Sequence, residues 1–339
     1  MNPAPIGLAV FGAGRIGAVH VRNVAEHVPF ARLVGVADVD RAAAQRLVDS
    51  VGVGRVADVD SLLADPEVRG VIIATPTDSH SGLISKAAAA SKHVLCEKPI
   101  SLSLHATQAA MASAQRGGII LQVGFQRRFD EEFARARALV ESGALGQPRF
   151  LRLVGRDHRV PSLAYLRTSG GQFRDQMVHE FDLARWLLAP LQVDEIYASG
   201  SAQVEPKLAE FGDIDTSVAV LRFTSGALAV IDGSREAIYG YDIRGEIHGS
   251  KGMLLIGQGR LANGKLLDET FATADVDSFI ERFADAYRAE VQDFAQAIRD
   301  GRAPRVGAED ALEALRLAIA ADRSLATKRP VKVADVADD

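Results

Sequence analysis

The feature that most constrains the fold is a glycine-rich turn between an apolar segment and a helix-forming segment. Residues 6–11 read IGLAVF and predict a short buried strand, after which Gly12, Gly14 and Gly17 follow with the spacing Gly-x-Gly-x-x-Gly. In such a unit the first glycine permits the tight turn, the second lets a pyrophosphate approach the backbone, and the third lets the helix pack on the strand. The helix N-terminus would then offer its free N–H groups to the phosphates. The pattern predicts a dinucleotide site.

A second predicted strand supports this interpretation. Residues 31–38 read ARLVGVAD, and Asp38 lies roughly 20 residues beyond Gly17, where an acidic side chain binds the adenine ribose hydroxyls. A carboxylate at this place also repels a 2′-phosphate, which favours NAD over NADP. The alternative is a solvated Asp at a surface strand end.

Strands and helices continue to alternate up to about residue 126. Further strands are expected within 70–76, 93–99 and 119–125, and helices within 40–51, 58–65, 81–92 and 103–117. Asp40 is a plausible N-cap of the first of these helices, and Asp58 or Asp60 of the second. The alternation predicts βαβ units and a parallel sheet, whose ligands bind beyond the carboxyl ends of the strands. The residues expected at that edge are Thr75, Pro76, Glu97, Lys98 and Arg127.

The pattern changes from about Arg128 onward. A helix is expected near 130–146, followed by a strand, a further helix and several short strands, with a hairpin turn at Thr224-Ser225-Gly226. Short connections favour an antiparallel sheet. A length of 339 residues suggests two domains. We therefore expect a dinucleotide-binding domain at 1–126 and a second domain at 127–339, with two C-terminal helices, within 277–301 and 307–328, that could pack back on the first.

The stretch GGQFRDQMVHEFD, residues 170–182, places three ionisable groups in an apolar helical segment. On one α-helix Asp175, His179 and Asp182, at i, i+4 and i+7, would share a stripe. The stripe is either a solvated surface or is directed at a group that needs proton transfer. His179 suits a general base because its unperturbed pKa is about 6.5. Asp182 is expected on the helix surface or as a structural partner.

Five motifs occur in order along the chain: GAGRIG, ATPTDSH, CEKP, VGFQRRFD and GGQFRDQMVHEFD. Together they make the chain resemble the glucose–fructose oxidoreductase / inositol dehydrogenase family, and within it the bacterial inositol 2-dehydrogenases. The resemblance implies an N-terminal Rossmann domain that binds NAD. It also implies a C-terminal α+β domain with a large open, mostly antiparallel sheet, which the family commonly uses to form a homo-oligomer, here a dimer or a homotetramer.

The resemblance also implies roles for individual residues. The catalytic residues would be Lys98, Asp175 and His179. Substrate contacts would come from Lys98, Arg127, Asp175, His179 and Tyr239. Cofactor contacts would come from Gly12, Gly14, Arg15, Ile16, Gly17, Asp38, Thr75, Pro76, His80, Glu97 and Lys98. Alternatives from the residues themselves stay open: His80 could instead cap a loop, Arg127 and Arg128 could be surface charges, and Tyr239 and Tyr241 could be core or edge residues.

The expected chemistry is the oxidation of a secondary alcohol. A hydride must leave carbon for the nicotinamide while a proton leaves oxygen for a base. The Lys98 ammonium can stabilise alkoxide-like charge, Asp175 can stabilise an imidazolium or bind a substrate hydroxyl, and either Lys98 or His179 can take the proton first. The main hypothesis is myo-inositol oxidised to 2-keto-myo-inositol. The alternatives are a dehydrogenase or reductase of another sugar or polyol, and a non-catalytic NAD-binding regulator. Gln126 and residues 155–160 depart from the family pattern, which leaves the exact polyol open.

Bulk properties exclude several other classes. A net charge of −5 and a pI near 5.9 argue against a nucleic-acid binder. No apolar run reaches the roughly 18 residues that span a bilayer, and the N-terminus lacks the basic region of a signal peptide. The single cysteine, Cys96, is expected in a buried strand; it excludes an internal disulfide and a cysteine zinc site, and fits a reducing cytoplasm. The eight histidines show no metal-ligand spacing, so we expect no metal.

Overall fold

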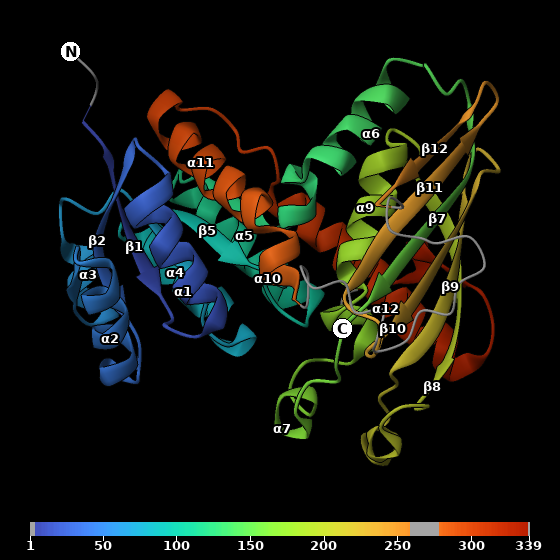
Figure 1. Ribbon diagram of the computed structural model, residues 1–339, viewed down its shortest axis with the longest axis horizontal. Helices are drawn as coiled ribbons and strands as arrows, with labels where there is room; N and C mark the ends of the chain where they lie inside the picture. The colour runs from blue at the N-terminus through green and yellow to red at the C-terminus, as the bar shows by residue number, and fades with distance from the viewer. Residues whose placement is uncertain (1–3, 258–277, 338–339) are drawn as a thin grey trace. The chain divides into compact units, whose positions relative to one another are not determined.

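The computed structural model describes residues 4–257 and 278–337, which form two compact units (Figure 1). Within these residues, the first unit contains the chain up to Phe129 together with Ala284–Leu312. The second contains the described parts of Asp130–Phe283 and Glu313–Ala337.

The first unit is built on a six-stranded parallel sheet with the order β3-β2-β1-β4-β5-β6. Its strands are β1 (Ile6–Phe11), β2 (Ala31–Ala37), β3 (Arg55–Val56), β4 (Gly70–Ile73), β5 (His93–Glu97) and β6 (Leu121–Gly124). Every residue of β1 and β4 is buried, as expected for central parallel strands covered on both faces. The predicted Rossmann-type domain is confirmed.

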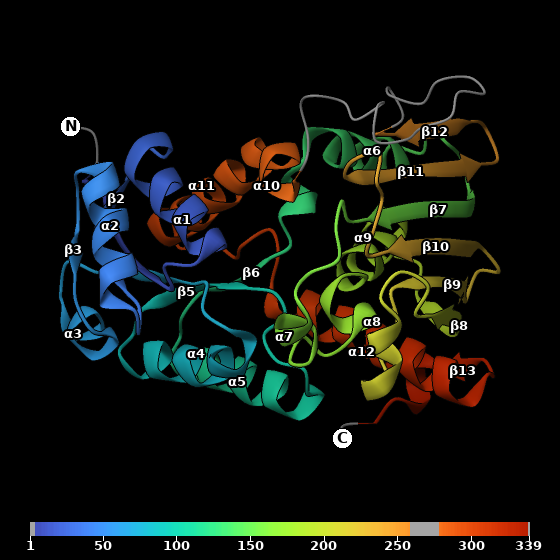
Figure 2. The same cartoon turned by 60° about the horizontal axis from the view of Figure 1, so that its bottom comes forward.

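Helices cover both faces of this sheet. They are α1 (Arg15–Arg22), η1 (Asn23–His27), α2 (Arg41–Val51), α3 (Val59–Ala64), η2 (Thr77–Ser79), α4 (His80–Ala89), α5 (Leu104–Arg116), η3 (Gln126–Phe129) and α11 (Ala284–Asp300). Figure 2 shows α4 and α5 on the face opposite to α1 and α11. From α11, Val291, Phe294 and Ile298 enter the same apolar core as β1. Residues distant in sequence therefore complete the first unit.

Two of the predicted helix caps lie where expected. The Asp40 carboxylate accepts hydrogen bonds from the N–H groups of Ala42 and Ala43 at the start of α2. For α3 the cap is Asp58, which accepts from Ser61 N, and Asp60 lies inside the first turn.

The second unit contains a seven-stranded sheet with the order β12-β11-β7-β10-β9-β8-β13. Its strands are β7 (Pro148–Arg156), β8 (Val193–Ser201), β9 (Thr216–Phe223), β10 (Leu228–Ser234), β11 (Asp242–Gly249), β12 (Met253–Ile256) and β13 (Val331–Lys332). Every neighbouring pair is antiparallel except β7 and β10. The predicted hairpin joins β9 to β10, with Gly226 at φ 88° and its N–H donating to Phe223 O. The predicted mostly antiparallel sheet is confirmed.

Side chains of this sheet alternate between a covered and an exposed face. The helical elements of the unit are α6 (Glu131–Glu141), α7 (Leu163–Leu166), α8 (Gln172–Asp175), α9 (Val178–Leu188), η4 (Pro206–Phe211), α10 (Phe279–Arg282), α12 (Ala308–Thr327, which begins in the first unit) and η6 (Val333–Asp335). Figure 1 shows α6, α9 and α12 along one face of the sheet. Tyr197, Val218 and Leu228 alternate with fully buried neighbours and are 40%, 37% and 39% exposed. These apolar side chains therefore lie on the other face.

The single helix expected through residues 170–182 is wrong: the segment forms α8 and the start of α9. Gly171 (φ 88°) precedes α8, and Met177 N donates to Gln172 O instead of continuing the α-helical ladder. The side-chain amide of Gln172 donates to Asp215 O, and that of Gln176 donates to Ser234 O. These tertiary hydrogen bonds override a local helix pattern.

The single helix expected across 277–301 is also wrong. It breaks at Phe283, whose φ of −114° and ψ of 22° separate α10 from α11. The buried Phe283 ring packs edge-on against the ring of Tyr241. Among the residues that the structure describes, no helix has the length and apolar character to cross a membrane.

Candidate active site

The glycine turn has the geometry that the three predicted roles require. Gly12 has φ 102°, and a Cβ there would collide with the carbonyl oxygen of Ala74. A Cβ on Gly17 would collide with the carbonyl oxygen of Gly12, so α1 packs on the turn only with glycine at this position. Around Gly14 no atom lies within 4 Å of an added Cβ. The second glycine therefore borders open space at the N-terminus of α1, which fits a dinucleotide pyrophosphate.

Asp38 follows β2 and is bonded to this turn. Its Oδ2 accepts from Ala13 N at 2.6 Å and its Oδ1 from Asp40 N at 2.7 Å. The side chain is therefore anchored beside the glycines rather than freely solvated, and each oxygen keeps a lone pair for a ribose hydroxyl. Arg15, at the start of α1, is exposed, and Ile16 is half-buried.

The loop after β4 contains the next predicted cofactor contacts. Thr75 Oγ1 shares a hydrogen bond of 2.6 Å with Ser79 Oγ, and Pro76 is exposed. His80 is buried, with Nδ1 2.8 Å from Pro99 O and Nε2 2.8 Å from Thr75 O. These contacts are those of a loop-capping residue, and they join the loop after β4 to the turn after β5.

Lys98 lies in that turn, directly after β5, and is half-buried. Its neighbour Pro99 is buried and is held by His80. Two residues earlier, Cys96 is fully buried, and burial followed by the Glu97 charge raises the pKa of its thiol well above the usual value. The predicted structural role of Cys96 is confirmed. Since β1, β4 and β5 are neighbours in a parallel sheet, Gly12, Thr75 and Lys98 follow strands that end at the same edge.

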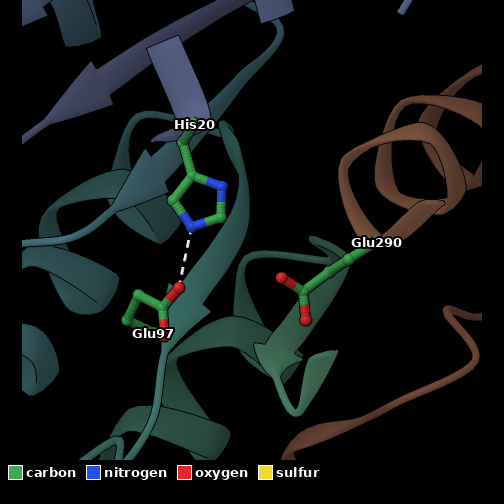
Figure 3. A group of neighbouring side chains, drawn as sticks. All are labelled: His20, Glu97 and Glu290. Atoms are coloured by element: carbon green, nitrogen blue, oxygen red, sulfur yellow. Dashed lines mark hydrogen bonds and ion pairs between the residues drawn. The ribbon is translucent and has the colours of Figure 1, made fainter. Parts of the chain in front are cut away.

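Two buried side chains near Lys98 were not predicted. His20, from α1, bonds Glu97 Oε1 through Nε2 at 2.7 Å, and Glu290, from α11, points toward this pair (Figure 3). Ligating atoms of the three residues lie within 4.8 Å of one another. A signal was present: His20 follows Gly17 by three positions on the buried stripe of α1, and Glu290 lies between Tyr287 and Val291 on the apolar stripe of α11. A charged group on an apolar stripe needs a partner.

In the second unit, Asp175 is the centre of a buried hydrogen-bonded network. Its Oδ1 accepts from Tyr165 Oη at 2.7 Å, and its Oδ2 accepts from Arg235 Nη1 at 3.0 Å. Arg235 is fully buried, and its guanidinium also lies 3.8 Å from Asp213. Burial followed by the Asp175 charge raises the pKa of Tyr165 well above its usual value, so its phenol stays a donor. Asp175 is therefore a carboxylate fixed by two donors.

His179 and Asp182 lie in α9, on a different helix from Asp175. His179 is half-buried in the first turn of α9. Asp182 is 1% exposed, so the expected position on the helix surface is wrong. The other alternative, a structural partner, agrees with this burial. The solvated-stripe alternative for the three residues is likewise wrong, because Asp175 is only 7% exposed.

The remaining predicted substrate contacts fall in both units. Arg127 and Arg128, in η3 of the first unit, are buried, so the surface alternative is wrong for both; Arg128 Nη2 donates to Asp310 Oδ1 at 2.8 Å. In the second unit Tyr239 Oη accepts from Arg156 Nη1 and donates to Asp242 Oδ2, each at 2.9 Å. Tyr239 also lines a cavity of about 500 Å³ with Arg156. Tyr241 is half-buried, and its ring packs against the rings of Phe279 and Phe283.

Comparisons with known proteins agree with this geometry. Residues 6–125 match the model of the oxidoreductase family with an NAD-binding Rossmann fold, and residues 137–333 match the C-terminal alpha/beta domain of the same family. The chain is 40% identical over 332 residues to the myo-inositol 2-dehydrogenase of Thermotoga maritima, covering 97% of this chain and 99% of the relative. It is 36% identical over 327 residues to the scyllo-inositol 2-dehydrogenase (NAD(+)) of Bacillus subtilis, covering 96% and 95%.

A solved structure gives the same picture. The scyllo-inositol dehydrogenase of Lactobacillus casei with bound NAD(H) and scyllo-inositol has a TM-score of 0.88 at 28% identity, covering 98% of this chain and 100% of that chain. Together the matches confirm the resemblance found in the motifs, the oxidoreductase class and NAD as the cofactor.

The geometry around Asp38 predicts how the chain discriminates between cofactors. Asp38→Asn removes the negative charge and keeps one oxygen acceptor, which can serve either Ala13 N or Asp40 N. Loss of repulsion toward a 2′-phosphate should lower the preference for NAD over NADP at least about tenfold, the equivalent of roughly 1.4 kcal/mol. Isothermal titration with each cofactor measures this ratio. Asp40→Asn is the matched control, because Asn caps α2 as well as Asp does and the ratio should not change. An unaltered ratio in Asp38→Asn would refute the assigned role.

Proposed function

The chain belongs to the oxidoreductase family with an NAD-binding Rossmann fold, and from this premise we propose that it oxidises a secondary hydroxyl of a cyclic polyol, with myo-inositol converted to 2-keto-myo-inositol as the main reaction. The observation that carries the proposal is the position of Lys98. It follows β5 at the edge of the sheet where the glycine turn and the Thr75 loop also lie. Ligands of such sheets bind at this edge.

The residues of the first unit would bind the cofactor and polarise the substrate. NAD accepts the hydride and so supplies the redox chemistry. Gly12, Gly14 and Gly17 with the N-terminus of α1 would hold its pyrophosphate, and Asp38 its adenine ribose. The half-buried Lys98 ammonium would hydrogen-bond the reacting oxygen and stabilise the negative charge that develops as its proton leaves.

The second unit would contribute the other acid–base groups. His179 is the proposed proton acceptor, in partnership with Lys98. Asp175 would accept a hydrogen bond from a substrate hydroxyl or stabilise the His179 imidazolium, and its bonds to Tyr165 and Arg235 fix its orientation beforehand. Fixed donors and acceptors suit a neutral substrate with many hydroxyls. Relatives named for both myo-inositol and scyllo-inositol support the inositols as the substrate class.

A substrate panel tests the proposed function. We expect NADH formation, followed at its absorbance, with myo-inositol, and a smaller kcat/KM with scyllo-inositol and with aldoses such as glucose and galactose. The expected discrimination is at least about tenfold, because a misplaced hydroxyl leaves fixed polar groups unpaired. Turnover of an aldose with none of any inositol would refute the polyol proposal. NAD binding with no turnover of either class would favour a non-catalytic regulator.

Replacing Lys98 with Ala tests the central residue. Loss of the ammonium should lower kcat by about 100-fold or more while the Kd for NAD changes by less than about threefold, since the lysine stabilises developing charge. The matched control is Lys92→Ala, a half-buried lysine just before β5 whose Nζ donates to Asp65 O and Val68 O. That variant should lose stability but keep its kcat. Undiminished turnover in Lys98→Ala would exclude the proposed site.

We also propose that the exposed face of the seven-stranded sheet binds a second copy of this chain, as part of a dimer or tetramer. Tyr197, Val218 and Leu228 on this face, with Met253 (57% exposed) and Leu255 (49% exposed) on β12, are large apolar side chains in contact with solvent. Apolar side chains gathered on one surface mark an interface more often than single scattered ones do.

A double substitution tests this interface. Tyr197→Lys with Val218→Lys should convert the oligomer into smaller species, because two charges per subunit would have to be buried unpaired. Light scattering after size exclusion gives the mass. Val53→Lys is the control, since Val53 is 46% exposed on a loop of the first unit. A monomeric wild-type protein, or an unchanged mass in the double variant, would contradict the interface.

A further inference from the structure

Three ionisable side chains of the first unit form a buried cluster next to the turn that carries Lys98. His20 and Glu290 are completely buried, and the side chain of Glu97 is 14% exposed. They come from α1, β5 and α11, and Figure 3 shows the carboxylate of Glu290 directed at the other two. A hydrogen bond joins His20 Nε2 to Glu97 Oε1 at 2.7 Å. Both carboxylate oxygens of Glu290 are buried and have no hydrogen-bond partner among the described residues.

The charges of this cluster require a proton on one carboxylate. Two carboxylates with ligating atoms within 4.8 Å cannot both stay ionised out of water without a large cost. Burial, followed by the charges of Glu97 and Asp293, raises the pKa of Glu290 well above its usual value. Glu97 accepts a hydrogen bond from His20, whereas neither oxygen of Glu290 has one among the described residues. Glu290 is therefore the residue that holds the proton.

The geometry favours a proton over a metal ion at this place. Ligands of a divalent cation direct their lone pairs at the ion from about 2.1 Å. Here His20 Nε2 instead donates its N–H to Glu97 Oε1, at hydrogen-bond distance. A neutral Glu290 offers one O–H donor, and a separation below 4.8 Å from its neighbours is closed by a small side-chain rotation or by one bridging water.

The cluster is connected to Lys98 through the backbone. Glu97 is the last residue of β5 and immediately precedes Lys98. On the other side, Pro99 O accepts a hydrogen bond from His80. A Cβ on Gly124, at the end of the neighbouring β6, would lie 2.9 Å from Glu97 Oε2, so the Glu97 carboxylate also packs tightly against the sheet. Lys98 therefore lies between Glu97 and Pro99. Glu97 is hydrogen-bonded to the buried imidazole of His20, and Pro99 O to that of His80.

We propose, on the basis of the function proposed above, that Glu290 is a neutral carboxylic acid that completes a hydrogen-bonded cluster with His20 and Glu97 and thereby acts as a positioning residue for Lys98. Glu290 does not touch the reacting atoms in this role. It contributes an O–H donor, which keeps the end of β5 in one conformation relative to α1. At position 290, a side chain with a hydrogen-bond donor should preserve the positioning of Lys98, whereas an apolar side chain of equal size should not.

Two substitutions at Glu290 separate the donor from the volume that it fills. Glu290→Gln keeps a neutral donor, so kcat and KM should stay within about twofold of wild type. Glu290→Met keeps the volume but removes the donor; we expect a stable protein with an unchanged Kd for NAD and a kcat lowered about tenfold at constant KM, as a displaced catalytic group predicts. Asp285→Asn, on the same helix but at the surface and paired with Arg288, is the control and should keep its kcat. Wild-type kcat in Glu290→Met would overturn the positioning role.

The same variants are measured without turnover. The labelling rate of Lys98 by an amine reagent, read by mass spectrometry against Lys92 in the same molecule, should match wild type in Glu290→Gln and differ at least about twofold in Glu290→Met, because the turn is then less restrained. Equal labelling rates of Lys98 in wild type, Glu290→Gln and Glu290→Met would contradict the proposal. This result stands whichever substrate the enzyme oxidises, so a failure of the inositol panel and a failure of the positioning role are distinguishable.

Infrared spectra test the protonation directly. At pH 8 the difference spectrum between wild type and Glu290→Gln should contain the C=O band of a protonated carboxyl. Asp322, whose pKa burial raises to about 6, is ionised at that pH. The absence of such a band would overturn the proposal that Glu290 is a neutral carboxylic acid. One equivalent of zinc or manganese in the wild-type protein, lost in Glu290→Gln, would overturn it in favour of a metal site.

Discussion

The contact between Gly17 and the carbonyl of Gly12 sets the geometry on which the first unit depends. Only a residue without a Cβ lets α1 approach the turn so closely. The approach places the N-terminus of α1 at the carboxyl end of β1, and three residues later His20 reaches Glu97 at the end of β5. A packing constraint in the dinucleotide motif therefore also determines where the turn with Lys98 is anchored. A shift of the helix by a fraction of an ångström would alter both at once.

The two units bury carboxylates in two different ways. Asp175 keeps its charge and is paired with the fully buried Arg235 and the phenol of Tyr165. Glu290 lies among other acidic groups, and its raised pKa leaves it neutral. A buried ion pair contributes little to stability, because desolvation cancels much of its Coulomb energy. The hydrogen bonds of Asp175 instead fix the orientation of its carboxylate, because a carboxylate with both oxygens bonded cannot rotate.

Local patterns in the sequence predicted the elements that local interactions determine. The glycine turn, Asp38, the capping of α2 and the alternation of strands and helices all follow from residues close together in the chain. The helix break at Gln176 and Met177 could not be found in this way, because it results from side-chain bonds of Gln172 and Gln176 to strands 40 to 60 residues away. Arg235, 60 positions from Asp175, escaped notice for the same reason. His20 and Glu290 were detectable as charges on apolar stripes, but their partnership across more than 250 residues was not.

The arrangement of these networks bears on how a polyol enzyme selects its substrate. A neutral substrate offers no charge to attract, so binding depends on hydroxyl groups that meet donors and acceptors of fixed direction. Such groups cost little to reorganise when they are already bonded within the protein, as Asp175 and Tyr239 are. The same rigidity penalises a substrate whose hydroxyl points elsewhere, because the fixed group then loses its bond to water and gains none. If the proposed substrate class is right, discrimination among inositol isomers, which differ only in hydroxyl direction, depends on internal hydrogen bonds that the substrate never touches.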